Sequence, residues 1–319
     1  MLNELMRQKQ KKDKAQMVEY WNAPQKHYDG ETKYYKVLDE RGRSCHGGSA
    51  KWSLPTRNAD GTWTPGDWMP EVGGILRLCL TGYHIVTIDQ LLDWLGPRIF
   101  EVEIGSNVMR VNINPDLALE RTVGQTYLQI DASIGADVIH GPDKSVVRQC
   151  RLTRECLGWN EWTARLFACD CAEKVLYIYE AEYPDDNRPR RAIEATRKYV
   201  KAVMENVSDA EIAEASCAVE AAYKAAHDAY IKAMGHAARC ASYAAELTTA
   251  IGSTEDNFLI YIEGDPAYAA VDAIAAEAKI AASKFTSDES TIRAAAETAR
   301  AKMRQWQVKR LSEILEREE

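Results

Sequence analysis

The stretch FACDCAEK, residues 167–174, places two thiols one residue apart beside two acids, a combination that could bind a metal ion or form a disulfide. Which chemistry is open to them depends on the element that carries them. Apolar side chains recur three and four positions apart over residues 159–183, which predicts an α-helix. Successive helical residues turn by about 100°, so Cys169 and Cys171 point to nearly opposite sides. We interpret both as thiols packed against neighbouring helices, and we predict neither a metal site nor a cofactor.

Zinc is the alternative at two other places in the chain. His236 and Cys240 lie four residues apart on one predicted helical face, which supplies half of a tetrahedral site. A second set would converge only if its strands pair suitably, and it consists of Cys45, His46, Cys79 and His84. The irregular spacing of that set favours ordinary hydrogen bonding in glycine-rich loops over metal binding.

The motif TGYH, residues 81–84, sets a histidine beside a glycine, and glycine permits the close backbone approach that suits a ligand loop. A Tyr-Lys strand precedes this motif and an EVE segment follows it, an order similar to that of ADP-ribosyl-transferring folds. The similarity implies that Tyr35 stacks on the nicotinamide of NAD, His84 holds the ribose and Glu103 assists transfer. This NAD-dependent enzyme is our alternative hypothesis, and the reading we favour assigns no catalytic residue. The standard nucleotide-binding and hydrolase motifs are absent.

The N-terminal part of the chain is predicted to be a small α+β domain over residues 31–140. Short apolar runs separated by turn residues predict its strands, at residues 33–39, 74–80, 98–104 and 108–113. Residues 87–96 predict a short helix that ends at Gly96. Residues 1–30 are expected to form a helix or a tail.

From about residue 148 the pattern becomes helical, and residues 148–317 predict an all-α, alanine-rich antiparallel bundle. Asp186 or Asn187 is expected to cap one helix, and Ser208 with Glu211 to form the capping box of the next. A further capping box is expected at residues 286–289. A polar connection at residues 135–150 is predicted to separate the two domains.

Charged residues also occur inside the predicted helices. Arg165 follows Glu161 by four residues, an ion-pair spacing on a helix. Together with Asp170, Glu173 and Arg191, these residues predict salt bridges between helices, and the alternative is that they line a polar cleft.

The overall charge narrows the class of partner. The chain has 40 Lys and Arg against 48 Asp and Glu, a formal net charge of −8, which argues against nucleic acid and favours a partner protein with a basic surface. No run of about 18 apolar residues predicts a membrane helix. No secretory pattern begins the sequence, so its eight cysteines are expected to be reduced in a cytoplasmic protein. Self-association into a homo-oligomer stays open.

Two segments mix aromatic and acidic residues in the way that protein interfaces do. One is YEAEYPDD, residues 179–186, and the other is EDNFLIYIEGDP, residues 255–266. The predicted partner-binding residues are Tyr179, Glu182, Tyr183, Asp185, Asp186, Phe258 and Tyr261. The alternative is that their apolar groups fold back onto the bundle.

Two resemblances indicate a function. The runs TARLFACDCAE and YPDDNRPRRAIE, followed by HAARCASYAA and MRQWQVKRL, resemble a bacterial helical family of immunity proteins over about residues 148–315. The resemblance implies a protein-binding inhibitor that neutralises a toxin, with no catalytic residue. The N-terminal half is similar to an uncharacterised domain of phage and bacterial proteins. That setting implies bacterial or phage conflict, either toxin immunity or phage counter-defence such as inhibition of a host defence complex.

Overall fold

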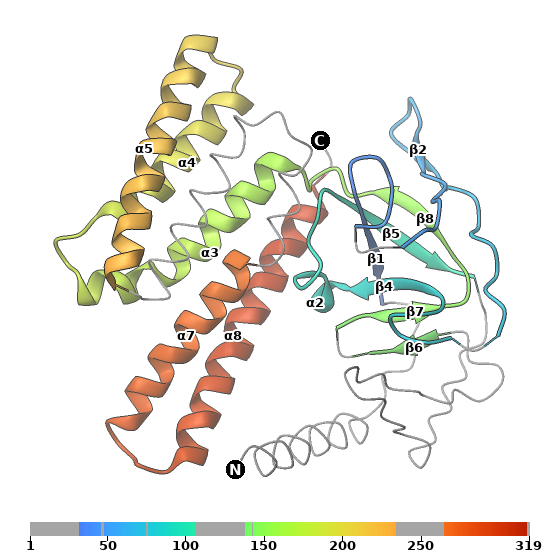
Figure 1. Cartoon of the computed structure of the whole chain (residues 1–319). Coiled ribbons are helices and arrows are strands. Elements are labelled where there is room, and N and C mark those ends of the chain that lie inside the picture. Colours follow the sequence, from blue (N-terminus) through green and yellow to red (C-terminus); the bar gives the residue numbers. More distant parts are fainter. Residues whose placement is uncertain are drawn as a thin grey trace. The chain divides into compact units, whose positions relative to one another are not determined.

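The structure is a computed structural model that describes residues 32–45, 48–74, 76–105, 138–141, 143–233 and 265–317. Its residues group into two compact units (Figure 1). The first takes the described residues up to Lys36 together with Trp52–Gln90 and Glu101–Arg154. The second takes Val37–Lys51, Leu91–Phe100 and the residues from Glu155 onward. The expected segment 1–30 lies outside the described residues.

Six strands form one sheet, in the order β6-β7-β4-β1-β5-β8. The strands are β1 (Tyr34–Leu38), β4 (Tyr83–Thr87), β5 (Arg98–Ile104), β6 (Val138–His140), β7 (Ser145–Val147) and β8 (Cys150–Glu155). Strand β4 pairs antiparallel with both β1 and β7, and β6 pairs antiparallel with β7. The interior strand β1 buries four of its five residues, because side chains on both of its faces are covered.

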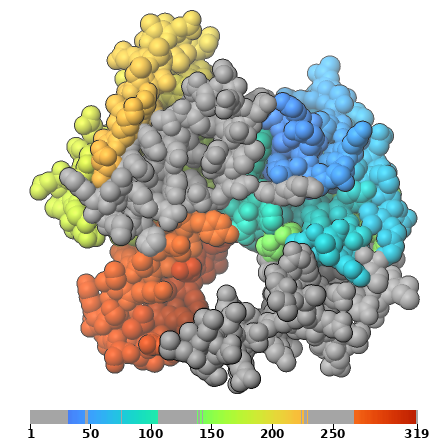
Figure 2. Space-filling view, viewed as in Figure 1, coloured from blue at the N-terminus to red at the C-terminus, as the bar shows by residue number. Residues whose placement is uncertain are grey.

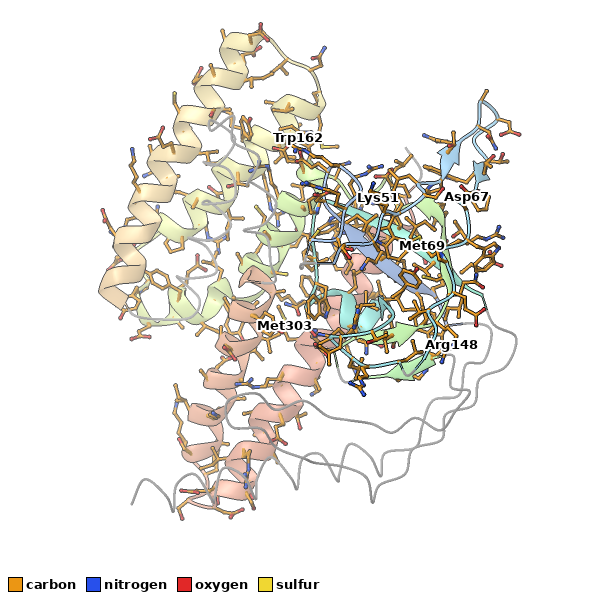
Figure 3. All side chains as sticks on the ribbon, turned by 45° about the vertical axis from the view of Figure 1, so that its right-hand side comes forward. Lys51, Asp67, Met69, Arg148, Trp162 and Met303 are labelled. Carbon is orange, nitrogen blue, oxygen red and sulfur yellow. The ribbon has the colours of Figure 1, made fainter. Side chains whose placement is uncertain are left out.

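A loop segment covers the outer edge of β8. The backbone N–H groups of Gly66, Met69 and Val72 donate to the carbonyls of Leu152, Cys150 and Arg148. Figure 3 marks Met69 and Arg148 in this region. These bonds occupy backbone groups that would otherwise be open to pairing with another chain. The preceding residues form a small hairpin of β2 (Thr56–Arg57) and β3 (Trp63–Thr64).

The predicted strand at residues 74–80 is wrong. Arg77 and Thr81 form an isolated bridge around a tight turn, and Cys79 adopts a positive φ of 65°. Leu76 is nevertheless buried and Leu78 partly buried, because both pack against Val146, whereas Leu80 is exposed. Burial without strand pairing therefore produced the strand-like pattern. The predicted strand at 108–113 lies outside the described residues.

The predictions for the strands at 33–39 and 98–104 are confirmed by β1 and β5. The expected helix at 87–96 is reduced to α2 (Ile88–Leu91) and a turn in which Trp94 N–H donates to the Leu91 carbonyl. The strands continue to Glu155, past the position where helix was expected. The division of the chain into domains 1–30, 31–140 and 148–317 stays a prediction.

The second unit is mostly helical from Glu161 onward, which confirms the predicted order of an α+β part followed by helices. Its helices are α3 (Glu161–Glu182), α4 (Arg188–Met204), α5 (Asp209–Ala233), α7 (Asp265–Ser283) and α8 (Glu289–Leu315). Helix α3 packs against α4, α7 and α8, while α4 packs against α5 and α7 against α8 (Figure 1). None of the helices in the described ranges is long and apolar enough to cross a membrane.

Local capping sets where these helices begin. Asn160 accepts from the N–H groups of Trp162 and Thr163, and the Thr163 hydroxyl accepts from the Asn160 N–H. The predicted capping box of Ser208 and Glu211 is confirmed. The box expected at residues 286–289 is wrong, because Asp288 is the capping residue of α8 and its carboxylate accepts from Ser290 and Thr291.

Asp170 of α3 joins three helices through one carboxylate. It accepts from Arg197 of α4 at 2.9 Å and from Arg310 of α8 at 2.7 Å. Glu173, one turn further along α3, accepts from Arg197 at 2.6 Å. The prediction of salt bridges between helices is confirmed for Asp170 and Glu173.

We expect Asp170→Asn to lower the free energy of unfolding by about 1–2 kcal/mol, because both arginines lose a charged acceptor while staying partly exposed. Urea denaturation followed by circular dichroism measures the change. Glu313→Gln is the matched control, since Glu313 contacts Arg310 only from an exposed i,i+3 position. Equal stability of the two variants would show that the Asp170 bridge does not hold the helices together.

Candidate functional site

The five residues that connect α3 to α4 form the candidate site. Helix α3 ends at Glu182, and the N–H of its capping residue Tyr183 donates to the Tyr179 carbonyl at 2.9 Å. Pro189 in the first turn of α4 suits a helix start, because proline lacks the N–H that would be unpaired there. A hollow of about 570 Å³ opens at this turn, lined by Glu182, Tyr183, Pro184, Asp185, Asp186, Asn187 and Arg188. Figure 2 shows the yellow-green atoms of the turn at the left of the molecular surface.

The inner side of the turn is a bonded network. The hydroxyl of buried Tyr179 donates to the Asp186 carboxylate at 2.8 Å. The same carboxylate accepts from the backbone N–H of Arg188 at 3.2 Å and from its guanidinium. Asp186 therefore holds the start of α4, whereas Asn187 makes no side-chain cap bond.

Charge and burial set the protonation of this network. The hydrogen bond from Arg188 holds the pKa of Asp186 well below its ordinary value, so the carboxylate stays ionised. Burial, reinforced by the bond to Asp186, raises the pKa of Tyr179 to about 12. The phenol consequently remains a neutral donor at physiological pH.

The outer side of the turn is open to solvent. The half-buried Tyr183 ring packs against Tyr179 in a tilted arrangement, with 4.9 Å between the ring centroids, and its hydroxyl donates to Glu182 at 3.1 Å. That bond raises the pKa of Tyr183, which keeps its ring neutral. Asp185 is exposed and has no hydrogen bond or ion pair to any other residue that the structure describes.

The structure thus brings together Tyr179, Glu182, Tyr183, Asp185 and Asp186, and it divides them between an inner and an outer side. Their role in binding stays a prediction, and the other two predicted residues, Phe258 and Tyr261, lie outside the described residues. Arg188, whose guanidinium pairs with the Asp186 carboxylate, was not predicted from the sequence. Its position at the start of α4, two residues after the acid, is the signal that could have identified it.

The interpretation of the paired cysteines as helix-packing thiols is confirmed. Cys169 and Cys171 are both fully buried in α3. Cys169 faces α4, where Thr196 and Arg197 influence its thiol, and burial raises its pKa to about 12. Cys171 faces α8, whose Gln307 amide lies 3.8 Å from the sulfur. Among the residues that the structure describes, no group of three or more His, Cys, Asp and Glu side chains is placed to bind a metal ion.

The three residues of the enzyme hypothesis each have a defined environment. Tyr35 is buried in β1. His84 of β4 accepts through Nε2 from the Cys79 N–H at 2.8 Å, and burial, reinforced by Lys36 and Lys144, lowers its pKa to about 4. Glu103 of β5 is bound to Arg151 at 2.7 Å.

His84 is therefore neutral, and because its Nε2 accepts a hydrogen bond, its proton is on Nδ1. The catalytic roles of the three residues stay a hypothesis.

The comparison with protein families matches the part of the chain that contains the candidate site. The model of the family described as "Imm-5 like putative immunity protein" matches residues 160–250. The match begins at the cap of α3 and includes α3, α4 and α5, and within these limits it confirms the resemblance to immunity proteins. No curated protein and no solved structure matches the chain.

We expect Cys169→Ala and Cys171→Ala to leave the metal content of the purified protein unchanged and to cost about 1 kcal/mol of stability each, since each removes a buried sulfur. Elemental analysis and urea denaturation measure the two quantities. The exposed Cys217, replaced by alanine, is the control that should change neither. Stoichiometric zinc that disappears in either buried-site variant would contradict the helix-packing interpretation.

Protonation of Asp186 at low pH should destabilise the α3–α4 turn. Its pKa in the folded protein lies below the ordinary value of 3.8, so its stabilising contribution is complete above that value and is lost as the pH falls through the folded-state pKa. We expect the stability of the natural protein to fall more steeply from about pH 5 to about pH 2 than that of Asp186→Asn. Urea titrations at each pH measure the free energy of unfolding. If it changes with pH equally in both proteins, the Asp186–Arg188 contact does not stabilise the fold.

Proposed function

We propose that this chain is a protein-binding inhibitor that neutralises a toxin. The observation that carries the proposal is the match of the immunity-protein family to residues 160–250. An immunity protein acts by occupying its toxin, so the function requires an exposed surface on a stable scaffold. Helices α3, α4 and α5 provide such a scaffold, because buried Tyr199, Val200, Ala215 and Val219 form a shared core with Trp162 and Leu166.

The turn between α3 and α4 is the surface that we propose for binding. It lies inside the matched region and presents a tyrosine ring and the unshared carboxylate of Asp185 beside a hollow. Aromatic side chains are common anchors of protein interfaces, and opposite charge accelerates encounter. The net charge of −8 favours a toxin with a basic surface.

We further propose that the neutralisation takes place in the cytoplasm during bacterial or phage conflict. The support is the similarity of the N-terminal half to a domain found in phage and bacterial proteins. Under this proposal the partner is a bacterial toxin or, in phage counter-defence, an effector of a host defence complex.

The proposal is tested with the full-length chain and one purified partner. Chemical cross-linking in the host followed by mass spectrometry identifies the partner, and mixing the two purified proteins measures its inhibition. We expect inhibition to be complete at one equivalent and independent of NAD. Inhibition at far lower ratios that requires NAD would contradict the proposal and favour the enzyme hypothesis.

At the interface we expect Tyr183→Ala to weaken partner binding by about 1–3 kcal/mol, because it removes an aromatic anchor at the mouth of the hollow. Isothermal titration calorimetry measures the affinity. Tyr177→Ala is the control, since Tyr177 is an exposed tyrosine of α3 that bonds to Glu277 of α7 instead of lining the hollow. Equal losses in both variants would exclude the turn as the specific contact.

A further inference from the structure

We propose that the hollow at the α3–α4 turn binds an arginine side chain of the partner, with the Asp185 carboxylate as its acceptor and the Tyr183 ring as its stacking surface. This inference rests on the proposed function, because it names the group that the neutralised protein would insert. It goes further by assigning the chemistry of recognition to two side chains.

The charges around the hollow call for a cation. Its lining includes three carboxylates, from Glu182, Asp185 and Asp186, and one guanidinium, from Arg188. Arg188 is already paired with Asp186, to which it donates through both its backbone N–H and its side chain. Glu182 accepts from the Tyr183 hydroxyl. Asp185 is therefore left with both oxygens available, and a carboxylate with two open oxygens suits the paired N–H groups of a guanidinium.

The aromatic side of the hollow is already held in place. Tyr183 lies against Tyr179, whose hydroxyl is fixed by Asp186. A ring restrained in this way loses little conformational freedom when a ligand stacks on it. The same unit uses this contact internally, since Arg165 lies 5.5 Å from the centroid of the Trp162 ring and Arg304 lies 5.8 Å from that of Tyr268. A cation over an aromatic face gains from the negative charge of the ring face.

Arginine fits this site better than lysine does. Its planar guanidinium can stack on a ring and bond a carboxylate in the same pose, whereas the lysine ammonium is a compact and strongly hydrated charge. The volume of about 570 Å³ accommodates one side chain together with part of its backbone. The neighbouring Asn187 side chain makes no cap bond, so its amide carbonyl remains available to the ligand.

The test uses a small probe and the full-length protein with carbon-13 in its tyrosine rings. The probe is N-acetyl-arginine-N-methylamide, and the controls are the matching citrulline and lysine compounds. Citrulline keeps the shape of arginine and removes its charge. The ring signal of Tyr183 is assigned from its disappearance in Tyr183→Phe.

We expect the arginine probe to shift this signal saturably at millimolar concentration, as suits a single exposed ion pair with one stacking contact. Citrulline should produce no saturable shift, and lysine should bind several-fold more weakly. Asp185→Asn should weaken arginine binding about fivefold. Glu205→Gln removes the same charge at the end of α4, outside the hollow, and should leave arginine binding unchanged.

The inference is overturned if the Tyr183 signal does not respond to arginine, if citrulline or lysine binds as tightly, or if Asp185→Asn and Glu205→Gln behave alike. The titration contains no toxin, so such a failure would leave the neutralising function intact. Conversely, a chain that binds arginine as expected but inhibits no partner would count against the neutralising function alone.

Discussion

One carboxylate on α3 fixes the geometry of the helical unit. Asp170 is bonded on one side to Arg197 of α4 and on the other to Arg310 of α8, so α3 cannot rotate about its axis without breaking a charged contact. This constraint on rotation also fixes which neighbouring helix each face of α3 contacts. Cys169 is accordingly buried against α4, and Cys171 is buried against α8. The end of α3 is oriented by the same constraint, and the turn that follows it carries the open side chains.

The α3–α4 turn has an inner side, where the side chains bond to one another, and an outer side, where they stay accessible. Tyr179, Asp186 and Arg188 satisfy one another and set the start of α4. Tyr183 and Asp185 sit on this support and remain accessible, which is the arrangement that a rigid binding site needs. The adjacent acids Asp185 and Asp186 therefore have different roles. The Arg188 guanidinium neutralises Asp186 and leaves Asp185 available for binding.

The two units present different kinds of polar chemistry. In the sheet-containing unit, His84 and Glu103 are engaged with Cys79 and Arg151, and the edge of β8 is covered by a bonded loop. In the helical unit, the α3–α4 turn leaves polar groups open beside a hollow. Open groups on a supported turn suit recognition of another protein, and this turn lies within residues 160–250, which the immunity-protein family model matches.

The sequence by itself determined the features that depend on near neighbours along the chain. The 100° turn per residue placed Cys169 and Cys171 on opposite sides, and Ser208 with Glu211 marked the start of α5, because helix rotation and capping bonds span only a few residues. Only the tertiary structure decided the features that join distant segments. Leu76 is buried without strand pairing because Val146 packs on it. Residues 66–72 cover the edge of β8. Asp170 pairs with Arg197 and Arg310, two of the many basic residues in the chain. Contacts of this kind arise from packing between segments far apart in the chain, and neither periodicity nor spacing specifies them.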